Sequence, residues 1–251
     1  LDFGSQYTQL IARRVRELKV YCEIQPCTWS LEQIKAFEAK AIILSGGPSS
    51  IFEKSAPQLD PKILALGIPV LGICYGMQAI VHVLGGTVEP AEHREYGRAF
   101  IKAAESNIIL NHIVTWPMQV WMSHGDRITK LPNGFHTLAV SANSPCASFA
   151  NHEKNIYGLQ FHPEVAHTPE GIKIIKAFIF DIAKCEADWS MHSFIETQIN
   201  SIRKRVGKAK VICGLSGGVD SSVAAVLLHQ AIGDQLTCIF VDNGFLRKHE
   251  R

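Results

Sequence analysis

The segment Gly-Ile-Cys-Tyr-Gly at residues 72–76 joins a short apolar run, residues 69–73, to an apolar stretch with helical spacing, residues 77–84. A buried strand can pass this abruptly into a helix only when small residues flank the turn, because larger side chains would strike the sheet or the helix. The helix then points its N-terminus, with its partial positive charge, at the cysteine sulfur and favours the thiolate. The segment therefore predicts an α/β fold that presents Cys74 as a nucleophile at a strand end.

The spacing of apolar residues predicts alternating helices and strands in the first half of the chain. Helices are predicted at residues 7–18, after the capping box Ser30-Leu31-Glu32-Gln33, and at 77–84; strands are predicted at 20–24, 41–44 and 69–73. Turn residues separate short β-like runs between residues 87 and 161, and a helix is predicted at 169–184. This order predicts an open, mostly parallel sheet with helices on both faces.

A break near residues 185–192 divides the chain into two predicted domains, residues 1–187 and 188–251. Ser190 is predicted to cap a long amphipathic linker helix. A β-loop-α-β unit follows, with strands at 210–215 and 236–241 and a helix at 219–231. We interpret residues 188–251 as the linker helix and the first part of a second α/β nucleotide-binding domain, and we expect the chain to be a piece of a longer protein.

Composition excludes several classes of protein. Hydrophobic residues make up 47% and charged residues 19% of the chain, which is a globular balance, and the net charge of +2 indicates no nucleic acid or acidic membrane as partner. The basic run at residues 203–210 lies at a predicted helix end, where cations favour the helix dipole. Seven scattered cysteines without a CxxC pair predict neither disulfides nor a structural zinc site, and they favour a cytoplasmic location. No apolar run is long enough to cross a membrane.

A base for Cys74 is found 88 residues downstream, in Gln-Phe-His-Pro-Glu at residues 160–164. His162 can take the thiol proton and return it to a leaving amine, while Glu164 holds the imidazole in place. Alone, the tripeptide His-Pro-Glu would favour a surface turn, and a lone cysteine is most often a buried structural residue. The combination of the two motifs instead favours a catalytic site.

The loop Ser-Gly-Gly-Pro-Ser at residues 45–49 follows another predicted strand. Its backbone N–H groups, together with that of Tyr75, can stabilise an oxyanion, although a plain Gly-Pro turn would explain the loop taken by itself. These motifs, in this order over about residues 1–184, resemble the class I, or triad, glutamine amidotransferases. Ser-His-Gly-Asp at residues 123–126 extends the resemblance.

The resemblance implies a flavodoxin-like fold and hydrolysis of glutamine through a γ-glutamyl thioester on Cys74, with His162 and Glu164 completing the triad. It implies oxyanion donors at Gly47 and Tyr75. The residues that it implies for holding glutamine are Gln78, Ser123, His124 and Asp126.

A second motif, Ser-Gly-Gly-Val-Asp-Ser-Ser, occupies residues 216–222 between a predicted strand and a predicted helix. Its glycines allow the backbone to approach phosphate, and its hydroxyls and the helix N-terminus supply donors, although a serine-rich helix cap remains the alternative. The Gly-Lys-Ser/Thr ending of a Walker A loop is missing. The motif resembles the PP-loop of the ATP pyrophosphatases, which implies ATP as substrate and Asp220 as a residue that positions Mg2+. The ATP-binding residues implied are Ser216, Gly217, Gly218, Val219, Asp220, Ser221 and Ser222.

An amidotransferase followed directly by a PP-loop resembles the glutamine-hydrolysing GMP synthetase family. Further agreement lies in residues 2–7, 94–97 and 241–244, and in the helix after Trp189. The resemblance implies a ligase, homodimeric at full length, in which ATP adenylates xanthosine 5′-monophosphate (XMP) and ammonia from glutamine displaces AMP to form GMP. Residues that bind XMP are expected outside this chain.

Two other functions remain open at this point. A cysteine hydrolase on the same fold would pass no ammonia onward, but it would leave the PP-loop without a role. A nucleotide-binding regulatory module would carry a vestigial triad, although no triad position is substituted here.

Overall fold

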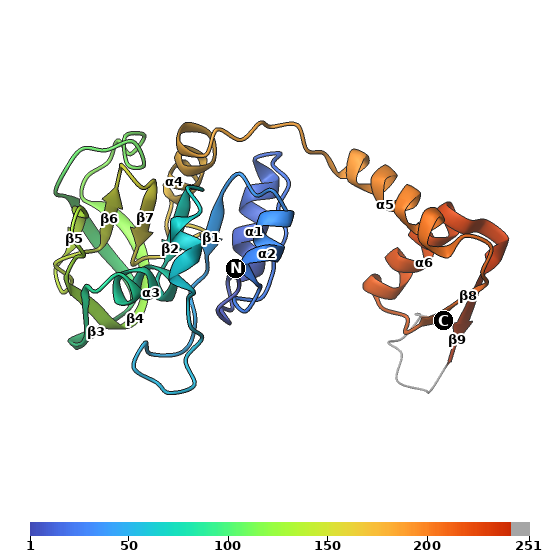
Figure 1. Cartoon of the computed structure of the whole chain (residues 1–251), viewed down its shortest axis with the longest axis horizontal. Helices are drawn as coiled ribbons and strands as arrows, with labels where there is room; N and C mark the ends of the chain where they lie inside the picture. The colour runs from blue at the N-terminus through green and yellow to red at the C-terminus, as the bar shows by residue number, and fades with distance from the viewer. Residues whose placement is uncertain (242–251) are drawn as a thin grey trace. The chain divides into compact units, whose positions relative to one another are not determined.

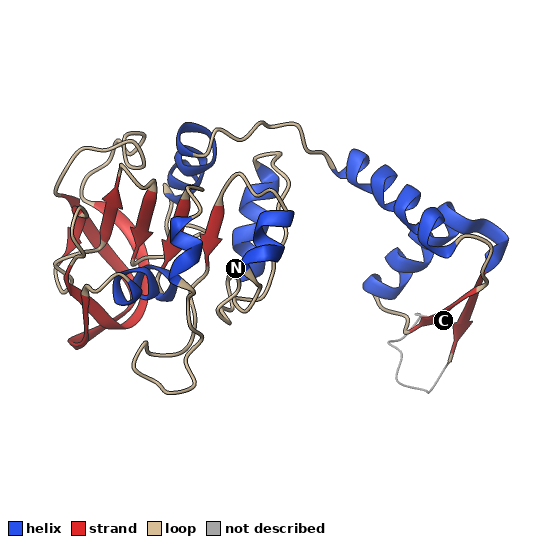
Figure 2. Cartoon of the chain, viewed as in Figure 1, coloured by secondary structure: helices blue, strands red, loops and turns tan. Residues whose placement is uncertain are grey.

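A computed structural model of the chain describes residues 1–241, apart from the side chains of residues 92, 93, 192 and 193 (Figures 1 and 2). The predicted motif at residues 241–244 therefore extends outside the described residues. The chain divides into two compact units, Leu1–Asp188 and Trp189–Arg251, one residue beyond the predicted boundary.

The first unit is built on one sheet, which has seven strands in the described part of the chain, in the order β1-β2-β7-β6-β5-β3-β4. Strands β1, β2 and β7 are parallel, and the remaining four pair antiparallel. The α/β class is thus confirmed, and the parallel part of the sheet is the part that carries Cys74. The other strands pair antiparallel because loops without helices connect β3 through to β7. The strand bounds are β1 Ile42–Leu44, β2 Val70–Ile73, β3 Thr87–Ala103, β4 Met118–Lys130, β5 His136–Ser141, β6 Ser148–Asn151 and β7 Ile156–Leu159.

Helices cover both faces of the parallel strands, as predicted. Side chains of α1 and α4 pack in one core cluster with Leu71 and Ile73 of β2, whereas α3 packs with Val70 in a second cluster. The two clusters take alternate residues of β2 because successive side chains of a strand point to opposite faces. The helix bounds are α1 Thr8–Glu17, α2 Leu31–Ala36, η1 Pro61–Ala65, α3 Tyr75–Val83, α4 Gly171–Lys176 and its π-helical continuation η2 Ala177–Ile182.

The strand predicted at residues 20–24 is wrong. This segment joins no ladder in the described structure, and the neighbouring stretch of chain, residues 1–3, lies instead beside residues 25–27. There the N–H of Asp2 donates to Gln25 O at 2.8 Å, and that of Cys27 donates to Asp2 O at 3.1 Å. Val20 of this segment is buried against Ile11 and Val15 of α1, as its apolar side chain suggests. A strand, however, also needs a neighbouring strand to hydrogen-bond with along its length. The capping box at Ser30 is confirmed, with both reciprocal hydrogen bonds present.

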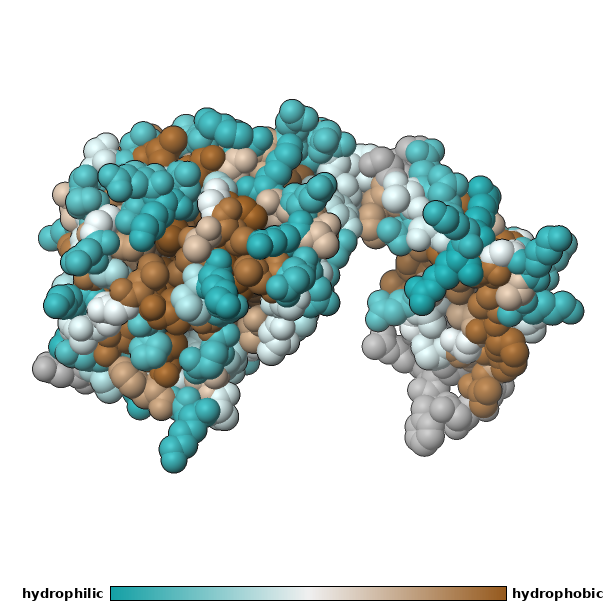
Figure 3. Space-filling model, viewed as in Figure 1, coloured by the Kyte–Doolittle hydropathy of each residue, from teal (hydrophilic) through white to brown (hydrophobic). Residues whose placement is uncertain are grey.

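The second unit contains the predicted β-loop-α-β arrangement. Helix α5 Met191–Val206 precedes β8 Val211–Leu215, α6 Val219–Ile232, η3 Gly233–Gln235 and β9 Leu236–Phe240, and the two strands are parallel. Large apolar side chains remain exposed here, including Ile212 on β8 and Val219, Val223 and Val226 on α6, and Figure 3 shows apolar surface on this unit. Within residues 1–241, no helix combines the length and the apolar character that crossing a membrane requires.

Candidate active site

Cys74 lies on a tight turn between β2 and α3, where its backbone has φ +51° and ψ −106°. This left-handed conformation strains a non-glycine residue, and such strain is typical of functional positions. The flanking glycines permit the turn. A Cβ on Gly76 would lie 2.5 Å from the carbonyl oxygen of Leu44 on β1, and a Cβ on Gly72 would lie 2.7 Å from the Gly76 backbone. The predicted tight turn between strand and helix is therefore present. It leaves no room for a side chain at Gly72 or Gly76, because α3 lies at backbone contact distance from β1 and β2.

His162 and Glu164 follow directly after β7, the strand that pairs with β2. His162 Nδ1 lies 2.7 Å from Glu164 Oε1, and both side chains are buried. The backbone of His162 is held from two sides, since its N–H donates to Trp121 O at 3.0 Å and its carbonyl accepts from Thr168 Oγ1 at 2.7 Å. The imidazole thus has a fixed position and a carboxylate partner.

The His162 and Cys74 side chains converge beside Gly46. A Cβ built on Gly46 would lie 3.1 Å from His162 Cε1 and 3.6 Å from Cys74 Cβ. Burial by itself lowers the pKa of His162, but hydrogen bonding with Cys74 and Glu164 outweighs it and raises the pKa to about 10. His162 therefore holds a proton at neutral pH, which it can give to a leaving group.

The predicted oxyanion loop packs against the start of α3. A Cβ on Gly47 would lie 3.3 Å from Tyr75 Cγ, and the N–H of Gly76 donates to Ser45 O at 3.1 Å. Tyr75 is the first residue of α3, and the first N–H groups of a helix have no partner within it. The structure thus places Gly47 and Tyr75 side by side, next to the nucleophile.

The four residues predicted to hold glutamine are each connected to Cys74 or to one another. In its thiol form Cys74 Sγ donates to Ser123 O at 3.4 Å. Gln78 Nε2 donates to Asp126 O at 3.0 Å and to Gln160 Oε1 at 3.3 Å, and Gln160 Nε2 lies 3.9 Å from the sulfur. Gln160 belongs to the motif that contains His162, but sequence reasoning assigned it no role.

The side chain of His124 has a partner within the protein at each ring nitrogen. Its Nδ1 lies 2.9 Å from Asp126 O and its Nε2 lies 3.0 Å from Glu95 Oε2. Both ring nitrogens are therefore occupied inside the protein, and sequence reasoning missed Glu95 as their partner. The Asp126 carboxylate accepts from Ser50 Oγ at 2.6 Å, a contact that ties the segment after the oxyanion loop to β4.

The phosphate-binding motif forms a compact loop between β8 and α6, with Gly217 at φ +81°. Ser221 Oγ accepts from the N–H of Ser216 at 3.2 Å and lies 3.0 Å from Ser216 Oγ, and Ser222 Oγ donates to Gly218 O at 2.9 Å. The loop is exposed, and Asp220 lies in the first turn of α6. In the described structure the serine hydroxyls bond within the loop, which lies at the N-terminus of α6.

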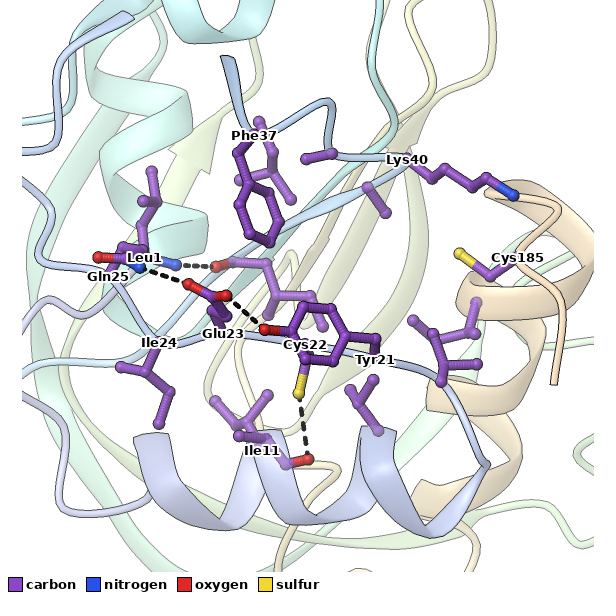
Figure 4. Close-up of a pocket in the computed structure, with 18 of the residues that line it drawn as sticks. Leu1, Ile11, Tyr21, Cys22, Glu23, Ile24, Gln25, Phe37, Lys40 and Cys185 are labelled. Carbon is purple, nitrogen blue, oxygen red and sulfur yellow. Dashed lines mark hydrogen bonds between the residues drawn. The ribbon is translucent and has the colours of Figure 1, made fainter. Parts of the chain in front are cut away.

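A cavity of about 420 Å³ lies between α1, residues 21–25 and the end of the first unit, near Cys185 (Figure 4). It is mainly apolar; Cys22 Sγ donates to Ala12 O at 3.4 Å, and the Tyr21 hydroxyl donates to Glu23. Among the described residues, none of the predicted triad lines this cavity, but Ser45, the first residue of the predicted oxyanion loop, does.

Comparison with known families agrees with this geometry. The family model for class I glutamine amidotransferases matches residues 1–182, and the chain belongs to this family. The model for the NAD synthase family matches residues 191–243, which include the phosphate-binding loop.

Among individual proteins, the chain is similar to glutamine-hydrolysing GMP synthases. It is 58% identical to that of Brachyspira hyodysenteriae over 250 residues and 55% identical to that of Acetivibrio thermocellus, covering all of this chain but 48% and 49% of theirs. The chain thus spans about half the length of the curated relatives that it matches.

Two solved structures resemble the chain. One, from Thermoplasma acidophilum and described as part of a candidate GMP synthase, is 31% identical with a TM-score of 0.61, and the match covers 79% of this chain and 94% of that one. A glutamine amidotransferase from Thermotoga maritima is 21% identical with a TM-score of 0.52, covering 62% and 81%, and supports the fold alone.

Proposed function

We propose that the chain is the glutaminase half, and the start of the synthetase half, of a glutamine-hydrolysing GMP synthase. The observation that carries the glutaminase assignment is the convergence of Cys74 and the buried His162–Glu164 pair beside Gly46. The phosphate-binding loop and the family matches of both units support the synthetase assignment. A cytoplasmic location and a homodimer of the full-length protein belong to the same proposal.

In the proposed reaction, the Cys74 thiolate attacks the side-chain amide carbon of glutamine. The N–H groups of Gly47 and Tyr75 stabilise the negative oxygen of the tetrahedral intermediate. The C–N bond then breaks as His162 gives its proton to the leaving nitrogen, so that ammonia departs and a γ-glutamyl thioester remains. His162 next takes a proton from water, which attacks the thioester and releases glutamate and the Cys74 thiolate. Glu164 stabilises the imidazolium whenever His162 holds the proton.

For glutamine binding, we propose that the substrate lies along residues 123–126, facing the sulfur. Ser123, whose carbonyl is within 3.4 Å of Cys74 Sγ, marks the reacting end, and Gln78 and Asp126 mark the adjoining wall. His124 contributes through its buried side chain rather than by direct contact, because both of its ring nitrogens are already engaged.

In the second unit, we propose that Ser216–Ser222 hold the phosphates of ATP. ATP adenylates the C2 oxygen of XMP with release of pyrophosphate, and ammonia displaces AMP to give GMP. The Asp220 carboxylate lies beside the loop and is a hard oxygen ligand of the kind that Mg2+ prefers, so it would hold the metal that accompanies ATP. Ammonia is mostly protonated at neutral pH, and joining its source to its acceptor in one polypeptide limits its loss.

The glutaminase assignment is tested by labelling the chain with a diazo-ketone analogue of glutamine and mapping the adduct by mass spectrometry. We expect one adduct, on Cys74, which excess glutamine prevents. Cys146 is an internal control, because burial raises the pKa of its thiol to about 12 and keeps it unreactive. His162→Gln should slow labelling. A folded chain that takes no adduct on Cys74 would contradict the assignment.

The division of labour is tested in the full-length protein. Cys74→Ala should abolish GMP synthesis from glutamine and leave synthesis from added ammonia intact, because the thiol serves only the first reaction. Asp220→Ala should reduce both, because adenylation precedes nitrogen transfer from either source. Equal loss of the two activities in Cys74→Ala would overturn the proposed coupling.

A further inference from the structure

We propose that Glu95 is a positioning residue for glutamine hydrolysis: through His124 it fixes residues 123–126, the wall of the glutamine site that faces Cys74. The inference rests on the proposed glutaminase function and deepens it. Glu95 touches neither the sulfur nor the catalytic imidazole in any contact described above, and its effect passes through a buried network.

The network joins β3 to β4. Glu95 and His124 are directly opposite each other in the ladder, and a register shift in β3 between Pro90 and Glu95 brings them into that alignment. His124 Nε2 lies 3.0 Å from Glu95 Oε2. From β5, Ser141 Oγ donates to both Glu95 oxygens at 3.0 Å. Three strands therefore hold one carboxylate.

A buried carboxylate such as that of Glu95 destabilises the fold unless hydrogen-bond donors surround it. Glu95 is 7% exposed and His124 is 4% exposed. Burial raises the pKa of Glu95, but hydrogen bonds from His124 and Ser141 outweigh it and hold the pKa below its ordinary value. Glu95 is thus a carboxylate in a largely dry environment, where removal of its partner or its charge is strongly felt.

The imidazole of His124 transmits this anchoring to the site. Its two ring nitrogens face two oxygen atoms, one from the Glu95 carboxylate and the other the carbonyl oxygen of Asp126. Asp126 O also accepts from Gln78 Nε2 at 3.0 Å. On the other side of His124, Ser123 O is the group that accepts from the Cys74 thiol at 3.4 Å. The His124 ring therefore anchors residues 123–126 between two carbonyl groups. That of Ser123 faces Cys74, and that of Asp126 faces Gln78 on α3.

This arrangement predicts a specific effect of Glu95→Gln. The amide keeps the shape and one acceptor oxygen but removes the negative charge and replaces the other oxygen with an N–H donor. His124 Nε2 and Ser141 Oγ, which both lie 3.0 Å from the Glu95 carboxylate, then share one acceptor oxygen. The contact that ties His124 to β3 is weakened, while Cys74, His162 and Glu164 keep their contacts.

The test compares two labelling rates at Cys74 in the 251-residue chain. The diazo-ketone analogue of glutamine must occupy the substrate site, whereas iodoacetamide needs only the thiolate. We expect Glu95→Gln to slow labelling by the analogue about tenfold or more, the effect of losing one charge-assisted hydrogen bond, with the iodoacetamide rate within about twofold of the original. Ser141→Ala removes the hydroxyl that donates to Glu95 and that accepts from the N–H groups of Asn143 and Ser144, and it should show the same split to a smaller extent.

Asn151→Ala is the matched control. Asn151 is a buried polar residue in the same sheet, and its side chain accepts from the N–H of Lys154 at 2.9 Å. Loss of the Asn151 side chain should lower the stability of the fold but change labelling by the analogue and by iodoacetamide to the same extent. The inference is overturned if both rates fall together in Glu95→Gln, if neither changes, or if Asn151→Ala gives the same split. If Glu95→Gln does not fold, Ser141→Ala decides by the same criterion. A chain without substitutions that takes no analogue refutes the glutaminase proposal first, and this inference with it.

Discussion

Gly76→Ala has two opposite effects on the free energy of unfolding. The higher helix propensity of alanine stabilises the fold, and the crowding of its methyl group destabilises it. In an exposed helix interior, alanine stabilises by about 1 kcal/mol relative to glycine. Here the new methyl group would lie 2.5 Å from Leu44 O and 2.7 Å from Leu44 Cβ, whereas ordinary contact begins at 3.4 Å. Restoring that contact requires α3 and β1 to separate by close to 0.9 Å. None of these atoms is the flexible end of a side chain, so the cost lies toward the upper part of the usual 1–3 kcal/mol or beyond, roughly 3 kcal/mol.

We therefore expect a net destabilisation of about 2 kcal/mol, which is a fall in Tm of about 4–8 °C for a unit of this size. Labelling of Cys74 by the glutamine analogue should slow by about a hundredfold, the penalty for moving a reacting group by close to 1 Å. Urea denaturation and labelling kinetics measure the two effects. Gly214→Ala is the control, because a Cβ there meets nothing within 4 Å. A Gly76→Ala chain as stable as the original would refute the packing argument.

Three further predictions concern stability. Ser30→Ala removes the 3.2 Å bond from the N–H of Gln33 to Ser30 Oγ and should cost about 1 kcal/mol in urea denaturation; no loss would mean that the capping box is redundant. Phe178→Ala empties a fully buried site and should cost about 3–5 kcal/mol, and a cost near zero would contradict its place in the core. The pKa of His162 is raised from 6.5 to about 10. Its contribution to the free energy of unfolding is therefore fully present below pH 6.5 and is lost as pH rises through about 10. His162→Asn should flatten the fall in urea midpoint across that range, and an unchanged slope would contradict the shift.

The features that sequence predicted best depend on residues close together in the chain. The elbow at Cys74 and the cap at Ser30 are local patterns whose geometry follows from residue size and hydrogen-bonding groups within a few positions. The approach of His162 to Cys74 was predicted across a long separation because two unusual motifs each follow a buried strand. Parallel strands place such ends at the same edge of a sheet.

The features that sequence missed depend on pairing between distant segments. The segment 20–24 has the apolar pattern of a strand, but pairing depends on which chain lies beside it. The resemblance implied glutamine binding for His124 from its place in Ser-His-Gly-Asp, but it did not indicate Glu95 as a partner, which a register shift in β3 brings opposite it. That shift lies in β3, near Pro90, and no local pattern in the sequence indicates its size.

The place of β7 between β2 and β6 has a consequence for how the protein is made. On the ribosome, Cys74 emerges well before His162, and the half-made sheet carries the thiol without its base. Cys74 and His162 come together only when β7 inserts, which is a late, long-range event in the assembly of such a sheet. Nascent chains therefore carry Cys74 without His162 beside it, and under the proposed mechanism completion of the fold is the step that brings the base to the thiol.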